Sequence, residues 1–417
     1  MSPTDPSPES SAGAAIDRWL YAHFDELVAF RRHLHARPEP SGKEHETTAF
    51  IAERLEVAGL ETRVFACGTG LVCDIVPAGA PHDEGPMVAL RADIDALEMD
   101  DEKDVHYRSQ TPGVAHACGH DVHTSVVLGA GLYLAQLASQ EGRLDGRVRL
   151  IFQPAEERVP GGALDVIDDK GLDGVDAVLG VHCAPKLDVG KIGLRAGSIT
   201  AAADMIEITL SGPGGHTARP EDTVDMISLA ARIVTELPAI VNCELGDLGD
   251  EGSGTEVKLV FGSVHSGDAS NVIPTHAVVR GTARTRSVGT WQSLPAAFDR
   301  AVAALLDGTG ATVETAYVHG VPPVDNDETI TELVRRSAAP HLAADAITEA
   351  EHSWGGDDFA WYLRNAPGTY IRLGTHDPEG DHEPHDLHVG QFDVDERSIA
   401  VGVRVLAASV LELFDSR

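Results

Sequence analysis

The chain contains the sequence VRLIFQPAEE at residues 148–157, in which an apolar run is followed at once by two adjacent carboxylates. The run from Val148 to Phe152 has the length and composition of a buried strand. Glu156 and Glu157 come directly after the turn that ends it. Paired acids are most often solvated surface residues. Beyond the carboxyl end of a strand in an open α/β sheet, however, they would lie where such sheets bind ligands.

Two further apolar runs also lead into polar side chains. Met87–Leu90 is followed by Asp93 and Asp95, and Ala177–Val181 is followed by His182. Helical segments separate several of the runs, so the sequence predicts an α/β fold with a largely parallel central sheet and flanking helices. Three strands would then bring carboxylate and imidazole groups to one edge of that sheet.

A cysteine and a histidine precede a predicted helix in the motif Cys118-Gly119-His120-Asp121. A thiolate there would be favoured by the helix N-terminus and more strongly by a metal ion. Thiolate, imidazole and carboxylate are the usual ligands of zinc and related metals. Each motif alone is more often structural than functional, since a buried free cysteine or a core histidine is common. Spacing alone does not choose a ligand among the C-terminal histidines, which are His376, His382, His385 and His388.

The middle of the chain has a different pattern of elements. Between residues 200 and 318 the order is strand, helix, strand, strand, helix, strand, which is typical of a ferredoxin-like α+β domain. We therefore expect this domain to be inserted in a discontinuous catalytic domain. The expected divisions are a disordered tail at 1–15, a first catalytic segment at 16–199, the inserted domain at 200–318 and a second catalytic segment at 319–417.

The composition excludes several classes of protein. The chain has 417 residues, 42% hydrophobic and 24% charged, as in an ordinary globular protein large enough for two domains. Its formal charge of −34 disfavours nucleic acid and anionic membrane surfaces as partners. No membrane span or secretion signal is evident, and five scattered cysteines do not form a disulfide framework. We expect a cytoplasmic protein that does not bind membranes or nucleic acid.

Taken in order, five motifs resemble the amidohydrolase branch of the aminoacylase/carboxypeptidase metallopeptidase superfamily. This branch includes hippurate hydrolases, N-acyl-amino-acid amidohydrolases and auxin-conjugate hydrolases. The motifs are RRHLH at 31–35, RADIDAL at 91–97, HACGHD at 116–121, QPAEE at 153–157 and GGHTARP at 214–220. The resemblance implies metal-dependent hydrolysis of the amide bond of a small N-acyl amino acid or related conjugate.

The resemblance also implies two divalent metal ions per subunit, zinc or manganese, with cobalt or nickel as alternatives. Cys118 would bridge the two ions, where related peptidases carry an aspartate. His120 and His182 would complete one ion site, and Glu157 and His388 the other. His385 is the alternative to His388, because the sequence after His388 departs from the family pattern.

Further roles follow from the same resemblance. Glu156 matches the general base, and Asp95 matches a carboxylate that orients a metal-binding imidazole. The inserted domain resembles a lid and dimerisation domain, so a homodimer is expected. In that domain His216 would polarise the scissile carbonyl, while Asn271 and Arg284 would hold the substrate carboxylate. For Arg284 an ordinary surface position on a strand is an equal alternative.

Two other functions remain open at this level. A dipeptidase or acyl-ornithine deacylase of the same superfamily would use a similar site, but Cys118 in place of a bridging aspartate speaks against it. A catalytically silent binding protein could keep the fold. It would have no need of a base such as Glu156 beside a metal site.

Overall fold

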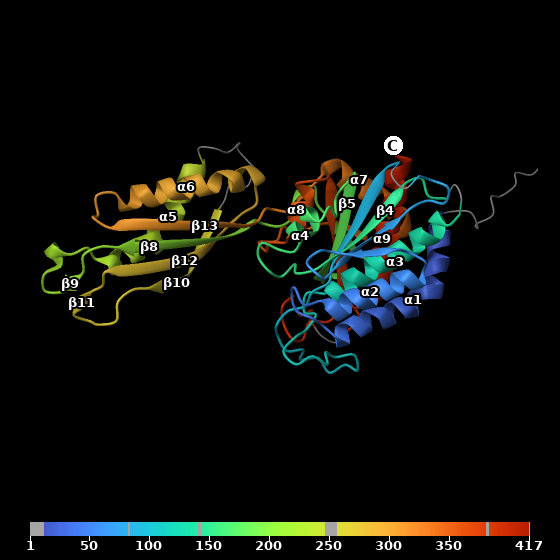
Figure 1. Cartoon of the computed structure of the whole chain (residues 1–417), viewed down its shortest axis with the longest axis horizontal. Helices are drawn as coiled ribbons and strands as arrows, with labels where there is room; N and C mark the ends of the chain where they lie inside the picture. Colours follow the sequence, from blue (N-terminus) through green and yellow to red (C-terminus); the bar gives the residue numbers. More distant parts are fainter. Residues whose placement is uncertain (1–11, 82–83, 141–142, 247–256, 381–382, 417) are drawn as a thin grey trace, which may run out of the picture. The chain divides into compact units, whose positions relative to one another are not determined.

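A computed structural model describes the chain at residues 12–81, 84–140, 143–246, 257–380 and 383–416. The chain divides into two compact units (Figure 1). The first contains the described residues of Met1–Gly197, Asn326–Glu351 and Trp361–Arg417, and the second contains those of Ser198–Asp325 and His352–Ala360. The short segment 352–360, expected in the second catalytic segment, thus belongs to the second unit.

An eight-stranded sheet forms the centre of the first unit, in the order β1-β2-β4-β3-β5-β16-β6-β15. Its central neighbours β4, β3, β5 and β16 run parallel, as do β6 and β15, while the pairs β1/β2, β2/β4 and β16/β6 are antiparallel. The predicted parallel sheet therefore occupies the middle of a mixed sheet. The strands are β1 (Thr62–Val64), β2 (Leu71–Ile75), β3 (Met87–Asp93), β4 (Arg147–Gln153), β5 (Ala177–Asp188), β6 (Ile192–Leu194), β15 (Ile347–Glu349) and β16 (Gly368–His376).

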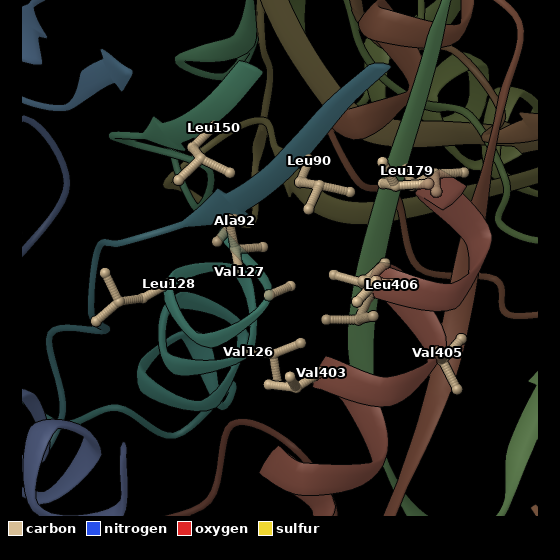
Figure 2. Close-up of a cluster of buried hydrophobic side chains, with 14 of the residues drawn as sticks. Leu90, Ala92, Val126, Val127, Leu128, Leu150, Leu179, Val403, Val405 and Leu406 are labelled. Carbon is tan, nitrogen blue, oxygen red and sulfur yellow. The ribbon is translucent and has the colours of Figure 1, made fainter. Parts of the chain in front are cut away.

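Helices flank this sheet and bury its apolar side chains. They are α1 (Ala12–Ala36), α2 (His45–Val57), α3 (His120–Ala138), α4 (Ala163–Asp168), α7 (Glu328–Ala338), α8 (Phe359–Leu363) and α9 (Arg397–Asp415), with a short 3₁₀ turn at Ala339–His341. Figure 2 shows Val126 of α3 and Leu406 of α9 packed with Leu90 and Leu179 of the sheet, all of them fully buried. Because α3 is buried along nearly its whole length, its first turn is held rigidly against the sheet.

The N-terminal tail is shorter than the sequence suggested. Residues 1–11 of the predicted tail lie outside the described residues, but α1 begins at Ala12, so residues 12–15 are helical. Apolar residues at Ile16, Leu20 and Leu27 follow helical spacing and are buried. This stripe begins at Ile16 and does not account for the helical turn at residues 12–15.

The second unit is built on a four-stranded antiparallel sheet in the order β10-β12-β8-β13. Along the chain, strands and helices alternate as βαββαβ, and this order with this strand arrangement is the ferredoxin-like pattern. Its elements are β8 (Ala203–Ser211), α5 (Met226–Gly246), β10 (Val257–His265), β12 (His276–Thr285), α6 (Val288–Leu306) and β13 (Thr312–Val321). A small ribbon pairs β9 (Gly215–His216) with β11 (Val272–Ile273), and a 3₁₀ turn covers Pro220–Asp222. The chain passes between the units at β7 (Gly197–Ser198) and β14 (Asp325–Asn326).

Helix α5 is long and apolar enough to cross a membrane by length and composition alone. No membrane span was expected from the sequence. One stripe of α5, including Met226, Ile233 and Leu237, is buried in the core of the second unit. Its exposed side carries an ion pair between Arg232 and Glu236. These features are those of a core helix with one solvated face.

The start of α2 differs from its sequence signature. Ser41 and Glu44 have the spacing of a capping box, but neither side chain caps the helix. The carboxylate of Glu39 instead accepts hydrogen bonds from the backbone N–H groups of Glu46 and Thr47. Ser41 and Glu44 are therefore available for contacts elsewhere in the fold.

Candidate metal centre

The candidate site lies where three parallel strands and one helix meet. Asp93 ends β3, Glu156 and Glu157 follow β4, and His120 begins α3. His182 was expected to close its strand, but β5 continues to Asp188, so this histidine lies within the strand. Strands β4, β3 and β5 are adjacent and parallel, which brings these groups together as the sequence predicted.

The five expected ligands form one connected cluster. One ligand atom each from Cys118, His120 and Glu157 lies within 4.8 Å of the other two. The Sγ atom of Cys118 lies 3.7 Å from Nε2 of His182. On the other side, Nε2 of His388 lies 3.2 Å from Oε1 of Glu157. Residues up to 270 positions apart in the chain therefore converge on one small volume.

Hydrogen bonds fix which nitrogen each buried histidine presents to this volume. Nδ1 of His120 donates to the backbone oxygen of Asp95 at 2.9 Å, and Nδ1 of His182 donates to the backbone oxygen of Cys183 at 2.8 Å. Each histidine therefore has Nε2 as the nitrogen left to face the cluster. Nε2 of His120 is buried and has no hydrogen-bond partner among the described residues. Imidazoles held in this way are the usual form of a metal ligand, so the residues fit a metal ion.

The charges around the cluster favour a cation. Burial opposes the charge on His120, but Asp93 and Asp95 outweigh it and raise the pKa of His120 to about 10. Burial, together with Glu157 and Glu156, raises the pKa of the Cys118 thiol well above its ordinary value. Both groups thus keep their protons against the surrounding negative charge, and a divalent cation would replace those protons.

Asp95 links several parts of the site. Its Oδ1 lies 3.2 Å from Nδ1 of His120. Its Oδ2 accepts hydrogen bonds from the backbone N–H of Glu157 at 3.1 Å and from the hydroxyl of Ser41 at 2.6 Å. Burial opposes ionisation, but these hydrogen bonds and His120 lower the pKa of Asp95. The ionised carboxylate therefore holds one candidate ligand by its ring and another by its backbone.

Glu44 is a site residue that the sequence analysis missed. It is fully buried, and its Oε1 accepts hydrogen bonds from the backbone N–H groups of Gly42 at 2.7 Å and Ala155 at 2.9 Å. Ala155 has a left-handed backbone with φ of 55°, which is unusual for a residue other than glycine. Because Ala155 immediately precedes Glu156, Glu44 fixes the turn that aims the expected base.

His123 was also missed, whereas Asp93 was expected only as a carboxylate at the end of its strand. Nδ1 of His123 donates to Asp93 at 2.6 Å, and its Nε2 accepts from the backbone N–H of Cys183 at 2.8 Å. Both ring nitrogens are thus used within the protein, so His123 is a structural residue although it lies in a metal-like group with Asp93 and His120. Its position three residues after His120 in a helix was the only available signal, since i and i+3 share a face.

The structure separates the two candidates for the last ligand. His388 contacts Glu157, and its backbone N–H is held by the backbone oxygen of Ala117 at 2.8 Å. Its φ of 62° is left-handed. Both histidines are exposed, but His385 forms no hydrogen bond or ion pair within the described ranges. The geometry favours His388.

The three remaining candidates lie in the second unit. His216 is paired with Val272 in the β9/β11 ribbon, and Thr217 donates its backbone N–H to the backbone oxygen of Asn271. His216 and Asn271 are therefore neighbours. Arg284 lies on β12 in the larger sheet, where its Nη1 donates to the backbone oxygen of Trp354 at 2.7 Å. The structure thus places His216 in the ribbon with Asn271 immediately before its second strand, and Arg284 on a separate element.

Comparison with known proteins identifies the class. Residues 89–412 match the model of peptidase family M20/M25/M40, and the chain belongs to this family. It is a metal-dependent amide hydrolase of the M20 type. A crystal structure of a Bacillus subtilis protein, described as a dinuclear metal binding peptidase from the M20 family, has a TM-score of 0.81 and 31% identity, over 95% of this chain and 99% of that one.

Curated relatives are similar along most of the chain. An N-acetyl-L-cysteine deacetylase of Bacillus subtilis is 38% identical over 94% of this chain and 89% of the relative. A protein of the same organism named as an amidohydrolase is 36% identical over 95% of this chain and 96% of the relative. A Rhodococcus jostii protein named as a glutamate–cysteine ligase is also 38% identical over 97% of this chain. However, the chain spans only 51% of that protein's length.

Proposed function

We propose that this protein hydrolyses the amide bond of N-acyl amino acids or related conjugates, releasing a carboxylic acid and an amino acid. The observation that carries this proposal is the convergence of Cys118, His120 and Glu157, one ligand atom each, within 4.8 Å. The deacetylase and amidohydrolase names of two relatives support the same chemistry. The proposed substrate is a small acylated amino acid.

We assign the metal ligands as Cys118, His120, His182, Glu157 and His388, for two divalent ions of zinc or manganese. When bound, such ions would lower the pKa of a water molecule and polarise the scissile carbonyl. The orientations of His120 and His182 support the assignment, because a backbone oxygen engages each Nδ1 and leaves Nε2 for a metal ion. The similarity to the Bacillus subtilis dinuclear metal binding peptidase supports the number of ions.

Glu156 is the proposed general base. Its Oε2 lies 3.9 Å from Nε2 of His120, so its carboxylate borders the ligand cluster. There it would take a proton from the attacking water and deliver it to the leaving nitrogen. The bond from Glu44 to Ala155 holds the turn before it, which limits where this carboxylate can move.

The second unit is proposed to serve as the lid and dimerisation domain. In this proposal His216 polarises the substrate carbonyl, while Asn271 and Arg284 bind the substrate carboxylate. The neighbouring positions of His216 in the ribbon and Asn271 just before β11 support a shared role. A homodimer in the cytoplasm completes the proposal, and light scattering on the purified protein measures the subunit count.

A substrate panel with and without a chelator tests the proposed function. The purified chain is assayed on N-acetyl, N-benzoyl and indole-acetyl amino acids and on dipeptides. We expect release of free amino acid from at least one N-acyl amino acid, loss of that activity in chelator and its return with added metal. Cleavage confined to dipeptides would make the protein a dipeptidase, and no metal-restored cleavage of any member would point to a silent binding protein.

A further inference from the structure

Three cationic side chains contact Trp354 in the second unit, two of them over its indole. Nζ of Lys258 lies 3.7 Å from the ring centroid, and the guanidinium carbon of Arg286 lies 4.2 Å from it. Arg284 reaches the same residue through its hydrogen bond to the backbone oxygen of Trp354. Trp354 belongs to the segment His352–Ala360, which joins the second unit from a distant part of the sequence.

The sheet places these positive charges together without a counter-charge. Lys258 on β10 lies directly opposite Arg284 on β12, and like charges in directly opposed positions destabilise a sheet. Within the described part of the chain, no carboxylate forms an ion pair with Lys258, Arg284 or Arg286. By contrast, Arg280 on the same strand is paired with Glu207.

This arrangement is unusual for so acidic a protein. The chain has 66 acidic residues and 32 lysines and arginines, so carboxylates for pairing are abundant. Nε of Arg286 is also buried without a hydrogen-bond partner among the described residues. Cation–π contacts hold the two head groups on the indole, but they do not neutralise charge. A bound anion would relieve the repulsion and satisfy the donors.

We propose that Lys258 and Arg286, held by Trp354 beside Arg284, form a binding site for a second carboxylate of the substrate. This inference rests on the proposed function, in which Arg284 binds the first carboxylate. One guanidinium is sufficient for one carboxylate, so two additional cations indicate a dianionic substrate. The preferred class is therefore an N-acyl amino acid with two carboxylates, the second on either the amino acid side chain or the acyl group.

Matched substrate pairs test this preference in the metal-loaded enzyme. N-acetylglutamate is compared with N-acetylglutamine. N-succinylleucine is compared with the analogue in which the succinyl carboxylate is an amide. The members of each pair differ mainly in one charge. We expect kcat/KM to favour the charged member by about tenfold or more in one pair, the scale of one charge-assisted hydrogen bond. The pair that shows this preference tells whether the second carboxylate is on the amino acid side chain or on the acyl group. Equal kcat/KM values in both pairs overturn the inference.

Variants assign that preference to the cluster. Lys258→Gln and Arg286→Gln are expected to bring the kcat/KM ratio close to one. Arg280→Gln, which alters a paired cation on the same strand, is expected to leave the ratio unchanged. If the preference survives in both cluster variants, the proposed site is wrong. Circular dichroism and thermal melting check that each variant is folded.

A binding measurement separates this inference from the proposed function. The full-length protein is titrated with glutarate while tryptophan emission is recorded, and Trp354→Phe identifies the signal from the cluster. We expect a saturable change that is lost in Lys258→Gln and weakened by salt. A protein that cleaves no amide but shows this change would contradict only the proposed function. A protein that cleaves amides without this change would contradict only the present inference.

Discussion

The buried carboxylate of Glu44 accepts a hydrogen bond from the backbone N–H of Ala155 at 2.9 Å, across 111 positions of the sequence. Ala155 is held in a left-handed conformation immediately before Glu156. The turn that carries the proposed base is therefore fixed by a residue from the loop between α1 and α2. Catalytic groups lose efficiency steeply when they are displaced by about 1 Å.

We predict that Glu44→Gln lowers kcat by about tenfold to a hundredfold with little change in KM, because the amide binds the N–H groups of Ala155 and Gly42 less strongly than a carboxylate does. Hydrogen exchange at the Ala155 amide should become faster. Glu46→Gln, a change at an exposed position in the first turn of α2, is the matched control. If kcat of Glu44→Gln equals that of this control, Glu44 does not position the proposed base.

Ser41 and Glu44 show why some contacts could not be predicted from the sequence. Their spacing predicts a capping box, which is a local motif, but both side chains bind partners that are distant in the sequence. Glu39 caps the helix instead. A local motif does not reveal that the backbone N–H of Ala155, 111 positions away, needs a hydrogen-bond acceptor. Tertiary contacts of this kind therefore could not be predicted.

The central strands and their polar ends were predictable for the opposite reason. The apolar run of β4 and the carboxylates of Glu156 and Glu157 are contiguous, so a single pattern encodes both the strand and its functional end. His182 could be selected although β5 continues beyond it. By contrast, spacing alone did not distinguish His388 from His385, and only the family resemblance favoured His388. The contact of His388 with Glu157 is a tertiary contact that spacing does not encode.

We predict that His388→Ala weakens metal binding, while His385→Ala does not. Loss of one ligand should raise the dissociation constant of one ion by about tenfold or more, given that even residues behind the ligands typically contribute this much. The matched pair is measured by chelator competition and elemental analysis. Equal metal retention by both variants would exclude His388 as a ligand.

Asp101 gives a prediction for stability against pH. Its carboxylate is buried and accepts from the backbone N–H groups of Lys103 and Ser109, with Nε2 of His35 at 3.2 Å. Burial alone would raise its pKa, but His35, Ser109 and Lys103 outweigh burial and lower the pKa of Asp101 below its ordinary value of 3.8. A lowered carboxylate pKa contributes stability that is complete above the unfolded value and is lost as pH falls toward the folded value.

Asp101→Asn should therefore reduce the free energy of unfolding by about 2 kcal/mol at pH 7, the scale of hydrogen bonds to a buried charge. The difference between the two proteins should shrink below about pH 4, where the unfolded carboxylate takes up its proton. Urea unfolding of both proteins at pH 7, 5 and 3.5 measures this difference in the free energy of unfolding. A difference that stays constant down to pH 3.5 would contradict the stated charge state.

The central claim is that Glu156 acts as the base beside a metal site made by other residues. It is tested most directly by measuring bound metal and turnover together in Glu156→Gln, with an N-acyl amino acid that the wild-type protein cleaves. The account predicts metal content equal to that of the wild type and turnover lower by about two to four orders of magnitude. Turnover equal to that of the wild type, with the same metal content, would contradict it.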